Sequence, residues 1–424
     1  MTAPITAAAP CLRTTFFAPR ARQLHFPHEG ILGQSAQAKK AAMNATIGIA
    51  LEDDGGPMHL PSLGRNVALP PNDVFPYAGS FGVPALREAW MQQMRQKNPS
   101  LSAPCSLPVV AAGITHALSV AVQLFADETI PILIPTPGWD NYRLIANVAG
   151  AAVRPYRVFN EHDAFDPRGL EEALQTVKRA CVILNFPLNP TGTVPTHDEA
   201  LALIAVLRSA AECGGHYVVI VDDAYAGFVF DDAAYGESLF SLLADAHPHL
   251  LAVKADGASK EDFAWGLRVA FLTFACPAAA REALDDVADA AAAAVRASVS
   301  NACLLSQQLL LHAYRSPTVE SERAERQAIL QRRYALACRA ARRPAYATSF
   351  TMLPCQGGYF LCLRPANGIN AEILRNALLR DEGVGVIALE GLIRVAFSSL
   401  ADADIDRVFE RIHRASQQLL LKPT

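Results

Sequence analysis

The sequence lacks the cysteine spacing of a metal site or of a disulfide framework. Its nine cysteines are odd in number and scattered, and no two of them form a Cys-x-x-Cys pair. Cysteines used in this way are typical of free thiols in a reducing compartment. We therefore expect a cytoplasmic location and no bound metal.

The chain also has little net charge and no long apolar run. A formal net charge of −4 over 424 residues gives no electrostatic reason to expect nucleic acid or an anionic membrane as a partner. No apolar segment is long enough to cross a bilayer, and residues 1–20 lack the pattern of a secretory signal. The composition, with 51% hydrophobic residues, is that of a globular protein whose partners are small molecules.

From about residue 85 the sequence alternates between apolar segments with strand character and amphipathic segments with helix character. Helices are expected at 86–97, 115–125 and 198–213. Strands are expected at 108–112, 130–135, 153–158, 180–186, 217–222, 250–255 and 268–275. This alternation predicts an α/β fold with a mostly parallel sheet covered by helices on both faces, and a ligand site beyond the carboxyl ends of the strands.

After Pro277 the pattern changes. An alanine-rich helix is expected at 278–297, and one long helix at 300–343 that bridges two domains. Strands at 358–364 and 392–397 and an amphipathic helix at 402–420 predict a smaller α+β unit. The predicted domains are an N-terminal arm that joins the small domain, a large domain, and a C-terminal small domain, at residues 1–60, 61–325 and 326–424.

An ordered set of polar residues follows the predicted strand ends. An Asn189-Pro-Thr-Gly turn follows one strand, Asp222-Asp-Ala-Tyr225 ends the next, and Lys260 lies beyond a third, eight residues before Arg268. A lysine amine, an Asp/Tyr pair, such a turn and an arginine are together the groups that hold pyridoxal phosphate (PLP) as a Schiff base.

Each chemical need of this cofactor has a candidate residue. Lys260 would bond the aldehyde, and Asp222 would keep the pyridine nitrogen protonated. Asn189 and Tyr225 would donate to the phenolate oxygen. The phosphate would be bound by a helix N-terminus at Gly113 and Ile114, by the Thr115 hydroxyl and by the forked cation of Arg268. The indole of Trp139 would lie against the face of the ring.

With these residues in this order, the chain resembles the fold-type I PLP enzymes of the class I/II aminotransferase family, most of all the aspartate aminotransferase-like branch. The resemblance covers nearly the whole chain and implies a large PLP-binding domain with a seven-stranded sheet plus a smaller α+β domain. Lys260, Asp222 and Tyr225 match the catalytic residues. Tyr77 matches a tyrosine that reaches the phosphate of the neighbouring subunit, which implies a homodimer with shared active sites.

The resemblance also implies which residues bind the substrate. Ile47 and Gly48 match an N-terminal segment that contacts it, beside Trp139 and Asn189. Arg394, in Leu392-Ile-Arg-Val-Ala-Phe, matches the arginine that binds the α-carboxylate. Arg296 lies where the aspartate enzymes place the arginine for a distal carboxylate.

Four positions depart from the family pattern. The serine that usually stands three residues before the lysine is Gly257 here, and Asp256 puts an acid near the expected phosphate. Ser259 or a main-chain N–H is expected to substitute for that serine. Tyr142 and Tyr359 stand where the aspartate enzymes usually carry other side chains, so the resemblance does not fix the substrate.

The resemblance implies an aminotransferase that moves an amino group between an α-amino acid and a 2-oxo acid, with a dicarboxylic partner if Arg296 reaches the site. The altered segment at 256–257 keeps open a β/γ-elimination, replacement or cyclising reaction, for example on S-adenosylmethionine. A transcription regulator with an aminotransferase-like domain is not expected, because residues 1–60 are too short and too rich in Pro and Gly for a helix-turn-helix domain.

Overall fold

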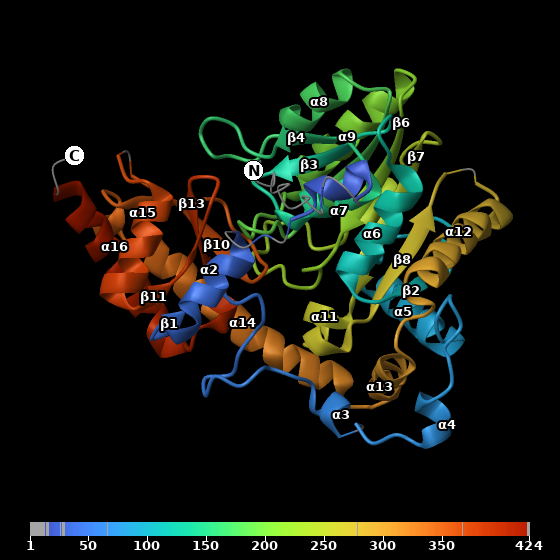
Figure 1. Ribbon diagram of the computed structural model, residues 1–424, viewed down its shortest axis with the longest axis horizontal. Helices are drawn as coiled ribbons and strands as arrows, with labels where there is room; N and C mark the ends of the chain where they lie inside the picture. The colour runs from blue at the N-terminus through green and yellow to red at the C-terminus, as the bar shows by residue number, and fades with distance from the viewer. Residues whose placement is uncertain are drawn as a thin grey trace, which may run out of the picture.

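The computed structural model describes residues 13, 17–25, 27, 30–65, 67–277, 279–366 and 368–421. It has an α/β fold with a large seven-stranded sheet and a separate four-stranded antiparallel sheet (Figure 1). The large sheet has the order β2-β8-β7-β6-β5-β3-β4, and every neighbouring pair is parallel except the two that involve β8. Its strands are β2 Val109–Ala111, β3 Ile132–Thr136, β4 Val153–Arg157, β5 Arg179–Asn185, β6 His216–Asp222, β7 Leu250–Gly257 and β8 Ala270–Ala275.

Helices cover both faces of this sheet because its strands are apolar on both sides. Along β3, Ile132 and Ile134 belong to one apolar core, while Leu133 belongs to the core on the opposite face. The first core is formed with α6, α7 and α12, and the second with α8, α9 and α10. The helices of this unit are α5 Pro84–Lys97, α6 Ile114–Phe125, α7 Asn141–Ala149, α8 Arg168–Gln175, α9 His197–Glu212, α10 Leu239–Leu243, α11 Ala258–Glu261, α12 Arg281–Val299 and α13 Leu304–Tyr314.

The smaller unit surrounds the sheet of order β12-β13-β10-β9. The N-terminal segment belongs to it, since β1 pairs in parallel with β11. Gln34 fixes α2 to β12 through two hydrogen bonds with the backbone of Ala388, at 2.9 and 2.8 Å. The elements here are β1 Met43–Asn44, β9 Phe350–Met352, β10 Phe360–Pro365, β11 Val384–Gly385, β12 Ile387–Leu389, β13 Leu392–Ala396, α2 Ile31–Gln37, α14 Val319–Ala341, α15 Ala371–Ala377 and α16 Asp402–Leu421.

Short elements connect these units. Two one-turn helices, α3 and α4, precede α5, and the remaining connections include single helical turns. Their bounds are α3 Pro61–Gly64, α4 Pro71–Val74, η1 Pro19–Gln23, η2 Ala38–Lys40, η3 Trp265–Leu267, η4 Pro344–Tyr346, η5 Leu378–Glu382 and η6 Phe397–Ser399. Within the described part of the chain, no helix has the length and apolar character that a bilayer crossing requires.

Two sequence-based expectations about elements are wrong. The single helix expected at 300–343 is two helices, α13 and α14, because Pro317 lacks an N–H donor and restrains the residue before it. The strand expected from residue 268 begins at Ala270, since Arg268 adopts a left-handed backbone with φ 55°. That conformation turns Arg268 out of the sheet and into the site described next.

Candidate active site

A cavity of about 270 Å³ lies at the carboxyl ends of β5, β6 and β7, where open α/β sheets bind ligands. Residues of both units and of the N-terminal segment surround it. The residues that line it are Ile31, Leu32, Ser35, Thr46, Gly48, Ile114, Thr115, Trp139, Tyr142, Asn185, Asn189, Asp222, Ala224, Tyr225, Ser259, Lys260, Arg268, Phe360 and Arg394.

Lys260 presents the only lysine amine to this cavity among the described residues. It lies in α11, directly after β7, and its Nζ is 5.0 Å from the centroid of the Tyr225 ring. Burial lowers the pKa of Lys260, and the nearby Asp222 carboxylate partly opposes this effect. A lowered pKa increases the fraction of neutral amine, the form that attacks a carbonyl.

Asp222 ends β6 and holds a carboxylate against the cavity from the side of the sheet. Its Oδ2 accepts a 2.6 Å hydrogen bond from Tyr142 Oη, and its Oδ1 accepts one of 3.1 Å from the Ala224 N–H. Burial raises the pKa of Asp222, while the bond from Tyr142 and the charge of Lys260 act in the opposite direction. The carboxyl is therefore oriented by two donors and lies close to a cation.

The loop after β5 is tied to the same strand end. Asn185 Nδ2 donates to the Asp222 carbonyl at 2.8 Å, and Asn185 Oδ1 accepts from the Asn189 N–H at 2.9 Å. Because Asn185 and Asp222 are paired in register, these bonds place the Asn189 side chain at the cavity. The turn motif is thus joined to the strand that carries the acid.

An anion-binding corner lies where α6 begins. Gly113 is the N-cap of α6 with φ 87°, and a Cβ there would lie 2.2 Å from Nη2 of Arg268. Only glycine allows the Arg268 guanidinium to lie this close. The first N–H groups of a helix have no partner within the helix, so Ile114 and Thr115 offer donors beside a forked cation.

Steric crowding explains why glycine stands at position 257, where the family usually has serine. A Cβ at Gly257 would lie 2.7 Å from both Ala270 Cα and the Val269 oxygen, so a serine has no space beside β8. Ser259 lines the cavity instead, and its buried Oγ has no hydrogen-bond partner among the described residues. Such an orphaned hydroxyl fits an anion ligand that fills this corner.

The expectation that Asp256 lies near the phosphate is wrong. Successive residues of a strand point to opposite faces, and Asp256 lines a different cavity, where it accepts a 3.0 Å hydrogen bond from Trp90 Nε1. No acid other than Asp222 lines the active-site cavity within the described part of the chain. The acid at position 256 therefore adds no carboxylate to the lining of the active-site cavity.

The small unit contributes Arg394 from the middle of β13. The residue is only 2% exposed, and its guanidinium donates to Asn189 Oδ1 and to the Thr46 carbonyl, both at 3.2 Å. The guanidinium carbon lies 4.1 Å from the centroid of the Phe360 ring, and burial lowers the pKa of Arg394. Its buried Nε has no partner among the described residues. A carboxylate that enters the cavity could satisfy this group.

Four predicted site residues are not among those that line this cavity. Gly113 is one of them, and it lies beside Arg268 at the N-terminus of α6. Ile47 does not line the cavity, although its neighbours Thr46 and Gly48 do. Tyr77 is 90% exposed. Arg296 is exposed near the end of α12, where its Nη1 donates to Ser300 Oγ at 3.5 Å. Tyr77 and Arg296 are thus exposed on the single chain and do not line its cavity.

The sequence did not indicate several residues that surround the cavity. Tyr142 supplies the hydrogen bond to Asp222, and Ile31, Leu32 and Ser35 of α2 line the open side. In the sequence, Tyr142 stands out only as a departure from the family pattern three residues after Trp139, and nothing there indicates its bond to Asp222. The contacts of α2 depend on packing between segments far apart in the chain, which no motif in the sequence indicates.

The fold and the site define an α/β protein with a lysine amine and a buried carboxylate in one cavity at the edge of its sheet. The family described as aminotransferase class I and II matches residues 61–412, and the chain belongs to this family. The protein is an aminotransferase, an enzyme that acts on amino acid and oxo acid substrates. Members of the family typically use PLP.

Known proteins agree with this assignment over most of the chain. An aspartate aminotransferase of Geobacillus stearothermophilus is 28% identical over 397 residues, which cover 90% of this chain and 94% of the relative. A solved aminotransferase of Anaerococcus prevotii superposes with a TM-score of 0.84 at 22% identity, covering 94% and 98% of the two chains. A mutant Thermus thermophilus aspartate aminotransferase has a TM-score of 0.74 at 20% identity, with coverage of 94% and 99%. The two structural matches concern the fold alone.

Proposed function

We propose that this aminotransferase binds PLP in the cavity around Lys260 and uses it to exchange an amino group between an α-amino acid and a 2-oxo acid. The observation that carries the proposal is that Lys260 and Asp222 line the same cavity. This cavity also holds two buried polar atoms that have no hydrogen-bond partner among the described residues, Ser259 Oγ and Arg394 Nε. The hydroxyl fits a phosphate group, and the guanidinium nitrogen fits a substrate carboxylate.

The residues fit the cofactor group by group. Lys260 would bond its aldehyde, and Asp222, held by Tyr142, would accept from its ring nitrogen. Asn189 and Tyr225 would meet its phenolate oxygen, and Trp139 would lie against its ring. Its phosphate would be held by residues of the corner at the start of α6 and by the hydroxyl of α11, namely Gly113, Ile114, Thr115, Ser259 and Arg268.

The chain's own groups would carry out binding and proton transfer. When bound, PLP supplies an electron sink for the electron pair released at the substrate Cα. The Lys260 amine would take the proton from the substrate Cα as a general base and then donate it again as a general acid. Its lowered pKa suits this work, because an amine that is neutral near the working pH can accept a proton.

Arg394 would bind the α-carboxylate and so orient the substrate with its Cα–H bond toward Lys260. Its hydrogen bonds to Asn189 and Thr46 would hold the guanidinium plane in place before a substrate arrives. Charge-assisted bonds of a preoriented guanidinium are among the stronger polar contacts in proteins. Gly48 and Trp139 would border the rest of the substrate. Ile47, next to Gly48 in the chain, is part of the same proposed substrate-contacting segment.

A dicarboxylic substrate would need a further cation. Among the described residues of the cavity, the cations are Lys260, Arg268 and Arg394, each of which already has a place in the proposal. We propose that the protein is a homodimer in which Arg296 and the exposed Tyr77 of one subunit reach the cavity of the other. Sedimentation of the holoprotein would then report a dimer, and a monomer with full activity would contradict this arrangement.

The reaction is tested by mixing the purified holoprotein with single amino acids and measuring oxo acid by coupled assay. Glutamate, aspartate, leucine and phenylalanine sample charged and apolar side chains. Release of the matching oxo acid, with conversion of the cofactor to its amine form, supports the proposal. If none of them reacts while S-adenosylmethionine releases methylthioadenosine, the proposed amino transfer is wrong.

A further inference from the structure

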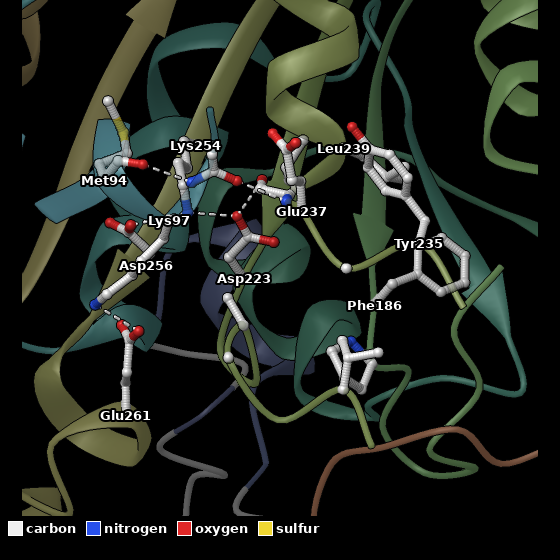
Figure 2. Close-up of a pocket in the computed structure, with 18 of the residues that line it drawn as sticks. Met94, Lys97, Phe186, Asp223, Tyr235, Glu237, Leu239, Lys254, Asp256 and Glu261 are labelled. Carbon is white, nitrogen blue, oxygen red and sulfur yellow. Dashed lines mark hydrogen bonds and ion pairs between the residues drawn. The ribbon is translucent and has the colours of Figure 1, made fainter. Parts of the chain in front are cut away.

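A second cavity, of about 360 Å³, is lined by residues of α5, β6, β7 and the loop before α10 (Figure 2). Lys254 of β7 lies at its base and is only 2% exposed. The amine forms ion pairs with Asp223, and with Asp256 at 2.8 Å from Nζ to Oδ2. A buried lysine held between two buried carboxylates has no role in the reaction described above.

These three residues lie close in sequence to the two principal groups of the active site. Asp223 directly follows Asp222, and the two side chains point into different cavities. Asp256 and Lys254 lie on the strand that leads into α11, where Lys260 faces the active site. We call Lys254, Asp223 and Asp256 the ion triad. Its ion pairs connect the segment that carries Asp222 to the strand that leads to Lys260.

Each carboxylate of the triad is anchored once more from another element. Ser238 Oγ donates to Asp223 Oδ2 at 2.5 Å, and the Asp223 N–H donates to the Ala255 carbonyl at 2.9 Å. Trp90 of α5 donates to Asp256 and stacks on Phe271 of β8, with ring centroids 4.2 Å apart. The triad is thus fixed in position by the loop before α10 and by α5.

The charge of the triad affects the pKa of Asp222 in the active site. Burial is the main cause that raises the pKa of Asp222, and the negative charge of Asp223 raises it further. Burial likewise raises the pKa of Asp256, against the effect of Lys254. Two aspartates and one lysine leave the triad with a single net negative charge, so loss of Lys254 would leave two buried like charges unneutralised.

We propose that Lys254 is a positioning residue that holds Asp223 and Asp256 together and so sets both the placement and the electrostatic potential of Asp222 and Lys260. The assignment rests on the proposed function of Lys260. Lys254 touches neither cofactor nor substrate in this arrangement, and it acts through the two aspartates. The remaining charged groups of its cavity are the more distant Lys97, Glu237, Glu261, Glu320 and Arg323.

The test uses variants that change the triad charge in opposite directions. Lys254→Met makes the triad more negative by one charge, Asp223→Asn makes it neutral, and the double variant restores the original net charge. The readout is the pH midpoint of the visible absorbance of the lysine-bound cofactor, because a more negative surrounding favours the protonated nitrogen. We expect Lys254→Met to raise the midpoint by about half a pH unit or more and Asp223→Asn to lower it by a similar amount. The double variant is expected to lie near the wild type, with kcat still reduced because the ionic contact is missing.

Glu320→Gln is the matched control, since it removes a carboxylate at the rim of the same cavity whose side chain is 71% exposed. Its midpoint is expected to stay at the wild-type value. Midpoints of Lys254→Met and Asp223→Asn that move in the same direction, or no further than this control, overturn the assignment. If Lys254→Met does not fold, an unmoved midpoint in Asp223→Asn overturns it alone.

A second readout does not depend on the cofactor. In protein stripped of PLP, the pH dependence of Lys260 acetylation by acetic anhydride, followed by mass spectrometry, reports the pKa of the free amine. The same order of variants is expected, highest for Lys254→Met and lowest for Asp223→Asn. Absence of a cofactor spectrum in the wild type would count against the proposed function, whereas equal Lys260 pKa values in the wild type and all variants would count against the role of the triad.

Discussion

Removal of the Tyr142 hydroxyl tests whether Asp222 works as an oriented, ionised carboxylate. The Oη–Oδ2 distance of 2.6 Å and the exposures of 1% for Tyr142 and 3% for Asp222 describe a buried, charge-assisted hydrogen bond. Such a bond contributes about 1.5–3 kcal/mol. Tyr142→Phe keeps the ring, which packs edge-on against Trp139 with centroids 5.3 Å apart, and deletes only the donor.

The expected result is a weaker cofactor complex, because the Tyr142 bond favours the charged form of Asp222. Loss of the full bond energy corresponds to a roughly 10- to 150-fold increase in the cofactor dissociation constant. The pKa of Asp222 should rise further, so cofactor affinity and kcat should fall off at a higher pH than in the wild type as the solution is acidified. Titration of stripped protein with PLP at several pH values measures both effects.

Tyr156→Phe is the control for this experiment. Tyr156 is also buried and donates to a backbone carbonyl, that of Ile183 at 2.7 Å, but it does not line the active-site cavity. It should lose stability and keep the cofactor affinity of the wild type. An unchanged dissociation constant and pH profile in Tyr142→Phe would refute the reasoning about Asp222.

Three further variants test other parts of the account. Gly257→Ser restores the residue usual in the family but forces a Cβ to 2.7 Å from β8 backbone at Ala270, so thermal unfolding should show a loss of about 1–3 kcal/mol; unchanged stability with tighter PLP binding would contradict this. Arg394→Lys removes the forked donor and should lower kcat/KM for every amino acid about tenfold or more, whereas a loss confined to one substrate would contradict its α-carboxylate role. Arg296→Gln should raise KM for glutamate and aspartate and leave that for leucine unchanged, and equal KM values for glutamate in variant and wild type would remove Arg296 from the site.

The sequence was sufficient for the residues that lie at strand ends. Lys260, Asp222 and Asn189 follow consecutive central strands, and parallel strands bring their carboxyl ends to one edge. Arg394 reaches the same cavity from the small unit, at a position that was assigned through family resemblance. Positions fixed by strand topology or by a family motif could therefore be placed without a structure.

Other features depend on packing that one sequence does not reveal. Side chains alternate between the two faces of a strand, so Asp256 points to the same face as Lys254, with which it forms an ion pair. The sequence alone does not show which of the two faces meets the active site. The bond from Tyr142 depends on how α7 packs on the sheet. The exposure of Tyr77 reflects a single chain, and its proposed role needs a second subunit.

The attachment of the cofactor to Lys260 is the central claim, and chemical trapping tests it most directly. The holoprotein would be reduced with borohydride, digested, and its peptides mapped by mass spectrometry. The account predicts a phosphopyridoxyl group on the Lys260 side chain and no such group in Lys260→Ala. A label on Lys254, the buried lysine of the neighbouring cavity, or an unlabelled protein would contradict it.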